Sequence, residues 1–255
     1  MKSASTLSII TATYNSQETI KDTLESVLRQ TVLPDELLII DGNSVDDTLT
    51  IVNSYLDKLP IRIISESDEG IYDAMNKGLR HCSCEIIGFL NSDDVFATQT
   101  CIHDLKNTFD TFEADIVYGN LVYVAADNLN RVTRRWISGL YSPDKLGSGW
   151  CMPHPAFYIR RHVLQSVGHF NLKYRLAADY DFIWRCLLTE HFNIVYLNKI
   201  IVKMREGGAT SGSLINIFRQ NIEIVDIVRN CKVDVNIPMF LFNKVVLKIV
   251  HRVVR

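Results

Sequence analysis

The chain has 255 residues, of which 47% are hydrophobic and 22% charged, and its formal charge at pH 7 is -2. These values are typical of one large globular domain, and they exclude the strongly basic surface of a nucleic-acid-binding protein. Six cysteines are scattered without metal-ligand spacing, so we expect reduced thiols rather than a disulfide framework. The N-terminus lacks the apolar segment of a signal peptide and no hydrophobic run approaches about 20 residues, which predicts a cytoplasmic protein without a membrane span.

Short apolar runs alternate with amphipathic segments through the first third of the chain. The run at residues 86–90 is continuous and ends in a polar break, as in a strand buried on both faces of a sheet. Further predicted strands lie at residues 7–10, 37–40 and 61–64. The segments between them have apolar residues at helical spacing, and two start with capping patterns, Asn15 with Glu18 and Ser44 with Asp47. This alternation predicts an α/β fold, because parallel strands need crossover helices.

Polar or acidic residues follow the predicted strands. Right-handed crossovers place the carboxyl ends of parallel strands at one edge of a sheet, so we expect these residues to converge: Thr11, Asp41, Asp68 and Asp93. Asp93 and Asp94 come directly after residues 86–90, where open α/β sheets bind ligands. Mg²⁺ is often held by one or two carboxylates plus substrate phosphates. The pair therefore indicates a metal-assisted nucleoside-diphosphate site, and the alternative is a polar loop that caps a helix.

The second half of the chain is less regular. Residues 116–118 and 194–202 contain predicted strands, and residues 180–188 and 214–228 contain predicted helices. Between residues 125 and 155 glycines and prolines are frequent, which is typical of a loop. A long loop in a compact domain is often functional.

Several motifs, in this order along the chain, resemble those of family-2 glycosyltransferases with a GT-A fold. They are TATYN (11–15), DGNSVDDT (41–48), SDEGIYDAMNKG (67–78), NSDD (91–94), HPAF (154–157) and AADYDF (177–182). The resemblance covers about residues 5–212. It implies a GT-A domain over residues 1–212, with a mostly parallel sheet flanked by helices, and a helical extension over residues 213–255. It also implies inverting transfer of a sugar from a nucleoside diphosphate to a saccharide or lipid-linked acceptor in surface polysaccharide assembly, with Mg²⁺ or Mn²⁺.

The resemblance assigns the nucleotide-sugar, for which a UDP-sugar is expected, to the predicted edge of the sheet. Asp41 would accept a hydrogen bond from the base or ribose, although Asp-Gly is also a turn signal. Thr11 and Tyr14 would contact the base, unless the tyrosine ring packs internally. Asp68 matches a base-contacting position. Lys77 could reach a phosphate or be an ordinary exposed lysine.

Asp93 and Asp94 match the ribose and metal motif of the family, with Asp93 nearer the ribose and Asp94 nearer the metal. Asn91 stands where the family more usually has an acid, which lowers the charge of the predicted site. The ion would bridge the diphosphate oxygens and neutralise charge on the leaving group. Arg185 and the turn at residues 205–208 could close over the diphosphate.

Asp179 is the candidate general base, because an inverting transfer needs a carboxylate that removes the proton of the acceptor hydroxyl. It matches the second acid of a Glu-Asp pair in the family, and Ala178 replaces the first. Asp181 is the alternative base, and either acid could cap the following helix. By resemblance His154 lies near the acceptor site, and Trp150 could stack on a sugar. A structural role is the alternative for both residues.

The segment 237–255 contains no acid, and its basic residues recur at helical spacing: Lys244, Lys248, Arg252 and Arg255. A basic amphipathic helix suits an anionic membrane surface, which predicts peripheral association at the inner face of the membrane. Packing against its own domain or a partner subunit is the alternative.

Two other functions compete with the glycosyltransferase. A sugar nucleotidyltransferase on a similar sheet would have a glycine-rich, basic first loop, and residues 11–15 contain neither feature. A non-catalytic sugar-nucleotide-binding subunit would lack acids near position 179, where the sequence has Asp179 and Asp181.

Overall fold

The computed structural model describes residues 5–189, 192–207, 214–231, 233 and 235–253. Its strands are β1 (Leu7–Thr13), β2 (Glu36–Asp41), β3 (Ile61–Ser65), β4 (Ile86–Phe89), β5 (Val95–Phe96), β6 (Ile116–Ala125), β7 (Asn128–Trp136), β8 (Phe157–Arg160) and β9 (Ile194–Arg205). Within the described residues they form one sheet in the order β3-β2-β1-β4-β8-β6-β9-β5, and β7 pairs with β6. β1 to β4 are mutually parallel, whereas β8 runs antiparallel to β4 and β6.

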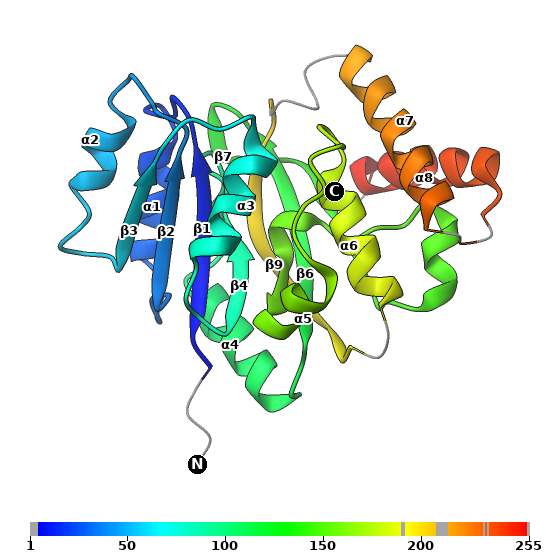
Figure 1. Cartoon of the computed structure of the whole chain (residues 1–255), viewed down its shortest axis with the longest axis horizontal. Helices are drawn as coiled ribbons and strands as arrows, with labels where there is room; N and C mark the ends of the chain where they lie inside the picture. The colour runs from blue at the N-terminus through cyan, green and yellow to red at the C-terminus, as the bar shows by residue number, and fades with distance from the viewer. Residues whose placement is uncertain (1–4, 190–191, 208–213, 232, 234, 254–255) are drawn as a thin grey trace.

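Helices cover both faces of the sheet (Figure 1). They are α1 (Ile20–Leu28), α2 (Thr48–Asn53), α3 (Ile71–His81), α4 (Cys101–Thr111), α5 (Arg161–Val167), α6 (Ala178–Leu188), α7 (Leu214–Asn230) and α8 (Ile237–Val253), with short 3-10 helices at Pro143–Ser148 and His154–Ala156. The predicted α/β class, with a mostly parallel sheet on its N-terminal side and helices at the C-terminus, is confirmed.

Successive side chains of β1 enter two different hydrophobic cores. Leu7 and Ile9 pack with residues of α1, α2 and α4 on one face of the sheet. Ile10 and Ala12 pack with residues of α3, α5 and α6 on the other, and residues of α7 and α8 join the same core. Because neighbouring side chains of a strand point to opposite faces, a strand that is covered on both faces has a continuous apolar sequence.

The strand order reverses next to β1. From β1 the chain proceeds outward through β2 and β3, and it returns to the other side of β1 at β4. In open α/β sheets ligands bind at such a switch point, in the crevice outside the carboxyl ends of the strands. The topology therefore directs attention to the loops that follow β1, β2, β3 and β4.

Residues 125–155 are not one long loop, contrary to the prediction. β6 extends to Ala125 and pairs with β7 as an antiparallel hairpin. β7 carries several exposed polar residues and pairs with β6 at the side of the sheet, so it lacks the continuous apolar pattern of the central strands. The 3-10 helices occupy much of the remaining segment.

Neither predicted helix cap forms. Asn15 has a left-handed backbone with a φ of 47°, and its side-chain oxygen accepts the N–H of Val45 at 2.9 Å. Ser44 hydrogen-bonds to the end of β2, and Asp47 precedes α2 without a side-chain capping bond. These polar residues instead tie the loops after β1 and β2 to each other, which is a long-range pairing that capping patterns do not reveal.

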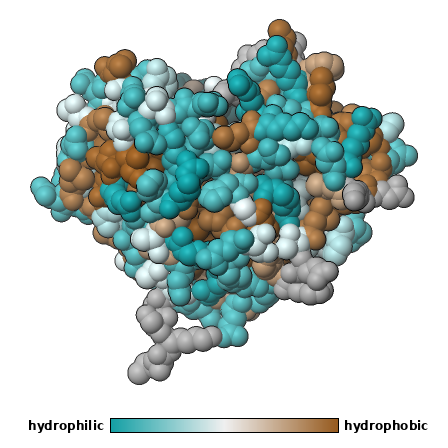
Figure 2. Space-filling model, viewed as in Figure 1, coloured by the Kyte–Doolittle hydropathy of each residue, from teal (hydrophilic) through white to brown (hydrophobic). Residues whose placement is uncertain are grey.

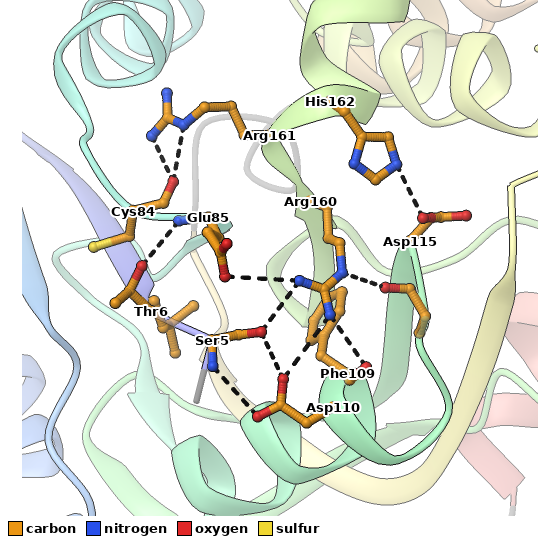
Figure 3. A network of polar contacts seen from close by, with 12 residues as sticks. Ser5, Thr6, Cys84, Glu85, Phe109, Asp110, Asp115, Arg160, Arg161 and His162 are labelled. Carbon is orange, nitrogen blue, oxygen red and sulfur yellow. Dashed lines mark hydrogen bonds and ion pairs between the residues drawn. The ribbon is translucent and has the colours of Figure 1, made fainter. Parts of the chain in front are cut away.

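A polar network fastens the opposite, amino edge of the sheet (Figure 3). The Nε of Arg160 donates to the carbonyl of Ala114 at 2.8 Å, and its Nη groups donate to Ser5 Oγ at 3.1 Å and to the carbonyl of Phe109 at 3.2 Å. Asp110 accepts the hydroxyl hydrogen of Ser5 at 2.5 Å. The guanidinium thus joins β8 to α4 and to the start of the chain, away from the ligand edge, and we assign this network to stability.

Candidate active site

The loops after β1, β2 and β3 meet around a glycine. A Cβ atom at Gly42 would lie 2.5 Å from Oδ2 of Asp68 and 3.4 Å from the ring of Tyr14. Tyr14 is 62% exposed, so its ring is available to a ligand. Gly70, with a φ of 123°, donates its N–H to Oδ1 of Asp68 at 2.8 Å and leads the chain into α3. Tyr14 and Asp68 therefore lie next to the end of β2, as the predicted convergence at the sheet edge requires.

Asp41 is fully buried at the end of β2, and both of its carboxylate oxygens accept hydrogen bonds. Oδ1 accepts from Ser44 Oγ at 2.5 Å, and Oδ2 accepts from Ser65 Oγ at 2.6 Å. This bonding holds the loop after β2. Thr11 lies inside β1, and its buried hydroxyl has no partner in the described part of the chain. Sequence reasoning missed Thr13, which has the same unpartnered hydroxyl but lies opposite Asp41 at the strand end.

Lys77 is buried and already paired. Its Nζ donates to the carbonyl of Ser67 at 2.5 Å and lies 3.1 Å from Glu66 and 3.7 Å from Asp73. It is therefore not an exposed lysine, and its charge is engaged by the two acids rather than directed at a phosphate. The amine ties the segment that carries Asp68 to the first turns of α3.

Asp93 and Asp94 follow β4 with different surroundings. The carboxylate of Asp94 accepts the backbone N–H of Arg205 at 3.1 Å and Nδ2 of Asn91 at 3.3 Å, and the residue is 1% exposed. Burial, together with the neighbouring charge of Asp93, raises the pKa of Asp94 well above its usual range. Burial also raises the pKa of Asp93, which is only half-buried. Asp93 is thus the more exposed of the two acids, and the assignment of Asp93 to the ribose and Asp94 to the metal stays a prediction.

Two arginines that were expected to close over a diphosphate have other partners. Arg205 donates to the carbonyl of Asp93 at 2.9 Å and pairs with Asp22 of α1. It therefore stabilises the backbone of the loop that carries Asp93 and Asp94. Arg185 pairs with Asp181 at 2.9 Å and donates to a backbone carbonyl at 2.7 Å. Gly208, part of the predicted closing turn, lies outside the described residues.

The acid pair fits a divalent cation that arrives with a nucleotide. Among the described residues, no cluster of three or more His, Cys, Asp or Glu side chains could hold a metal ion unaided. Asp93 and Asp94 supply two carboxylates, which is the number that Mg²⁺ sites use together with substrate phosphates. Because the pKa values of both acids are raised, the protein alone compensates their charge poorly, and a cation would do so.

Asp179 lies in the first turn of α6 and is half-buried. Its Oδ1 accepts two hydrogen bonds, one from the hydroxyl of Tyr72 at 2.9 Å and one from the backbone N–H of Tyr180 at 2.8 Å. Asp181 is buried, and its carboxylate pairs with Arg185 at 2.9 Å. Neither acid is the N-cap, which is Ala177. The surroundings distinguish the two acids, since Asp181 is engaged in an ion pair whereas Asp179 is tied to a neutral tyrosine.

His154 and Trp150 are both buried, with exposures of 7% and 8%. Trp150 donates its Nε1 hydrogen to a backbone carbonyl at 2.7 Å and packs within the core. The imidazole of His154 lies 4.9 Å from the ring of Phe89 and 5.5 Å from that of Phe170. Burial lowers the pKa of His154, against the opposing effect of Asp179, so the ring is neutral near pH 7. Packing is the role that the structure supports for Trp150. Both ring nitrogens of His154 are buried without a hydrogen-bond partner among the described residues, so its place near the acceptor stays a prediction.

Tyr123 of β6 carries a cation against its ring. Burial raises the pKa of its phenol, the guanidinium of Arg134 opposes that rise, and the carboxylates of Asp94 and Asp179 add to it. The guanidinium of Arg134 is 3.7 Å from the centre of this ring, and its buried Nε has no partner in the part of the chain that the structure describes. Sequence reasoning missed Arg134 because it assigned β7 to a loop, and it missed Tyr123 because the strand that it predicted there covered only residues 116–118.

This fold and site define the class of GT-A glycosyltransferases. Residues 1–349 of S. aureus TarS, solved in complex with UDP-GlcNAc, superpose with a TM-score of 0.67 at 20% identity, covering 95% of this chain and 70% of TarS 1–349. The mannosyltransferase PcManGT of Pyrobaculum calidifontis, in complex with GDP-Man and Mn²⁺, gives a TM-score of 0.66 at 16% identity, covering 96% of this chain and 70% of that one. At these identities the likeness concerns the fold.

Residues 8–173 match the model of Glycosyl transferase family 2, and the chain belongs to this family. A PGL/p-HBAD biosynthesis glycosyltransferase of Mycobacterium bovis strain BCG is 30% identical over 212 residues, which cover 82% of this chain and 80% of the relative. Chondroitin synthase of Escherichia coli is 30% identical over 230 residues, 87% of this chain but 32% of the synthase. The predicted family is confirmed, and membership favours a glycosyltransferase over a nucleotidyltransferase.

Proposed function

We propose that the protein transfers a sugar, with inversion, from a UDP-sugar to a hydroxyl of a saccharide or lipid-linked acceptor. The observation that carries this proposal is the position of Asp179. It is a half-buried carboxylate at the start of α6, and its hydrogen bond with Tyr72 joins it to a hollow beside α3. A carboxylate next to a hollow that an acceptor could enter is what a single-displacement transfer requires.

The donor base is proposed to bind between the exposed ring of Tyr14 and the carboxylate of Asp68. Gly42 lets both side chains come close to the loop after β2, because any side chain there would meet both residues. A carboxylate can accept the N–H of a pyrimidine ring, and an exposed aromatic ring can stack on it. The TarS complexes with UDP and UDP-GlcNAc support a UDP-sugar, and the GDP-Man complex of PcManGT makes a GDP-sugar the competitor to test.

In the proposed reaction the acceptor oxygen attacks the anomeric carbon while its proton passes to Asp179. The bond from that carbon to the diphosphate oxygen breaks, and its electron pair leaves with UDP. Asp93 and Asp94 would hold a Mg²⁺ or Mn²⁺ ion, which when bound would supply positive charge to the departing diphosphate. Arg134, whose Nε is buried without a described partner, lies over Tyr123 and could add positive charge at the same place.

The acceptor is proposed to approach through a hollow beside α3 rather than through the buried rings of His154 and Trp150. The hollow is lined by Glu69, Gly70, Ile71, Tyr72, Asp73, Leu172, Tyr174 and Arg175. Tyr72 joins it directly to Asp179 through the hydrogen bond of 2.9 Å. Relatives named for PGL/p-HBAD biosynthesis and chondroitin synthesis support a saccharide or glycolipid product.

The purified protein should release nucleotide from one donor in a panel of UDP-, GDP- and dTDP-sugars. We expect turnover with Mn²⁺ or Mg²⁺, loss of turnover with EDTA, and preference for a UDP-sugar; free nucleotide is measured by chromatography. Turnover that continues in EDTA would contradict the metal assignment. Binding of a donor without turnover, over a panel of glycan and lipid-linked acceptors, would instead favour the non-catalytic subunit.

The C-terminal helices combine a docked face with an exposed hydrophobic one. Phe240 of α8 is fully buried against Trp184 of α6, so this helix packs on its own domain, as one alternative predicted. Its outer face exposes Met239, Phe242 and Val245, and α7 exposes Ile215, Phe218 and Ile222. Hydrophobic atoms are visible at the outer end of α7 in Figure 2. None of the helices in the described residues could cross a membrane.

We infer that this exposed face, with the basic residues of segment 237–255, binds the anionic inner surface of a membrane, where a lipid-linked acceptor would be available. Lys248, Arg252 and Arg255 lie outside the side chains that the structure describes, so their part in the proposal rests on the sequence. Apolar area and positive charge together give reversible membrane binding.

Vesicle sedimentation should detect this binding. We expect the protein to sediment with vesicles that contain anionic lipid and not with neutral ones, and the double variant Phe242→Ser/Val245→Ser to lose most of it. Leu56→Ser/Phe112→Ser is the matched control, since it removes exposed hydrophobic side chains elsewhere, at 46% and 58% exposure. Equal sedimentation of both double variants would refute the proposal.

A further inference from the structure

Tyr72 and Asp179 form a hydrogen bond between two helix starts that are far apart in the sequence. Tyr72 lies in the first turn of α3 and Asp179 in the first turn of α6. The phenol donates to Oδ1 of the carboxylate at 2.9 Å, and the N–H of Tyr180 donates to the same oxygen at 2.8 Å. Among the described residues none donates a hydrogen bond to Oδ2 of Asp179, so the two carboxylate oxygens have different surroundings.

The tyrosine ring is held in place by its neighbours. Its centre lies 5.6 Å from the ring of Phe170, which in turn lies 4.7 Å from that of Phe182 on α6. Asn76, one turn further along α3, exchanges two hydrogen bonds of 2.9 Å with the backbone of Phe170. This buried clamp fixes α3 against the segment that precedes α6. This packing therefore restricts rotation of the Tyr72 side chain and keeps its hydroxyl directed at Asp179.

The hydroxyl of Tyr72 is the donor of this bond, because an ionised carboxylate can only accept. Burial and, next, the charge of Asp179 raise the pKa of Tyr72 well above its usual value of 10.0, so the phenol remains protonated at any working pH. A donor that faces a carboxylate favours its charged form, and it restricts rotation of the side chain. A general base must be ionised and correctly oriented before the acceptor binds.

We propose that Tyr72 is a positioning residue, which holds Asp179 by Oδ1 so that Oδ2 takes the proton of the acceptor hydroxyl. This inference rests on the proposed function, in which Asp179 is the base. Tyr72 itself neither gains nor loses a proton in the step. The proton moves from the acceptor oxygen to Oδ2, and the electron pair of the broken bond leaves with the nucleoside diphosphate.

Tyr72→Phe removes the hydroxyl and retains the packed ring. A lost hydrogen bond of about 1 to 1.5 kcal/mol corresponds to roughly a tenfold lower kcat. We expect that reduction, an unchanged KM for the donor, and a shift of the acid limb of the pH profile to higher pH. In an Asp179→Asn background the same substitution should have no further effect on the residual rate, because the two residues act as a unit.

Tyr55→Phe is the matched control. Tyr55 is also a buried tyrosine whose hydroxyl donates to a carboxylate, that of Glu25 on α1 at 2.7 Å, but it packs in the other hydrophobic core, outside the candidate site. Its loss should leave kcat and the pH profile unchanged. The positioning role is refuted if Tyr72→Phe matches wild type in kcat and pH profile, or if its effect adds fully to that of Asp179→Asn. Wild-type protein without transferase activity, or Asp179→Asn at full activity, would instead refute the proposed function.

Discussion

Asp179→Asn should reduce sugar transfer by about 10² to 10⁴-fold, which is the usual contribution of a general base. The amide is nearly isosteric with the carboxylate, and its oxygen can still accept the hydrogen bonds of Tyr72 and of the Tyr180 N–H. The fold and the affinity for the donor should therefore be retained. The measurement is kcat for transfer, together with donor affinity by calorimetry and a thermal melt for each variant.

Asp181→Asn is the control that separates the two acids of α6. This substitution breaks the ion pair with Arg185, whose N–O distance is 2.9 Å, so we expect a lower melting temperature with transfer within a few fold of wild type. If Asp181→Asn abolished transfer and Asp179→Asn did not, the base would be Asp181. The structure opposes that result because Arg185 already neutralises the Asp181 carboxylate.

The sequence contained part of the information that distinguishes these acids. Arg185 follows Asp181 by four residues on a predicted helix, and this spacing favours an ion pair, so Asp181 could have been assigned a structural role in advance. No residue pattern indicates the contact between Tyr72 and Asp179, which are 107 positions apart and meet only through the packing of α3 against α6. Side-chain pairs of this kind depend on tertiary structure.

The sheet shows the same division between local and long-range information. β1, β2 and β4 were predictable because strands covered on both faces are mostly apolar, and the half-exposed β3 still has three isoleucines. The edge that collects Tyr14, Asp68 and Asp93 followed from the parallel order of these strands. β7 was missed because it is paired by β6 and exposes polar side chains. As a consequence Arg134 was not considered, although it lies against Tyr123 beside the site.

Asp94→Asn should stabilise the free protein while it disables the enzyme. The carboxylate of Asp94 is buried next to Asp93, and burial and that neighbouring charge disfavour its ionised form. The amide oxygen can still accept the N–H of Arg205. Nδ2 of Asn91 faces Oδ2 of Asp94 at 3.3 Å, so the Asn91 amide must turn over for its unpartnered Oδ1 to accept from the new amide. Removing one charge should raise stability by on the order of 1 kcal/mol, or about 2–4 °C in Tm for a domain of this size.

The functional effects of Asp94→Asn should have the opposite sign. Transfer should fall by about 10² to 10³-fold, the range for loss of a group that stabilises developing charge. Wild type should gain thermal stability from UDP with Mn²⁺ beyond that from UDP alone, because a ligand stabilises the state that binds it, and the variant should lose this increment. Asp57→Asn, which removes an exposed acid after α2, should change neither property.

An unchanged cation-dependent shift in Asp94→Asn would mean that Asp93 alone suffices for the ion, as its greater exposure allows. A lower Tm in the absence of ligands would show that Arg205 and Asn91 already compensate the charge of Asp94, and the repulsion argument would be wrong.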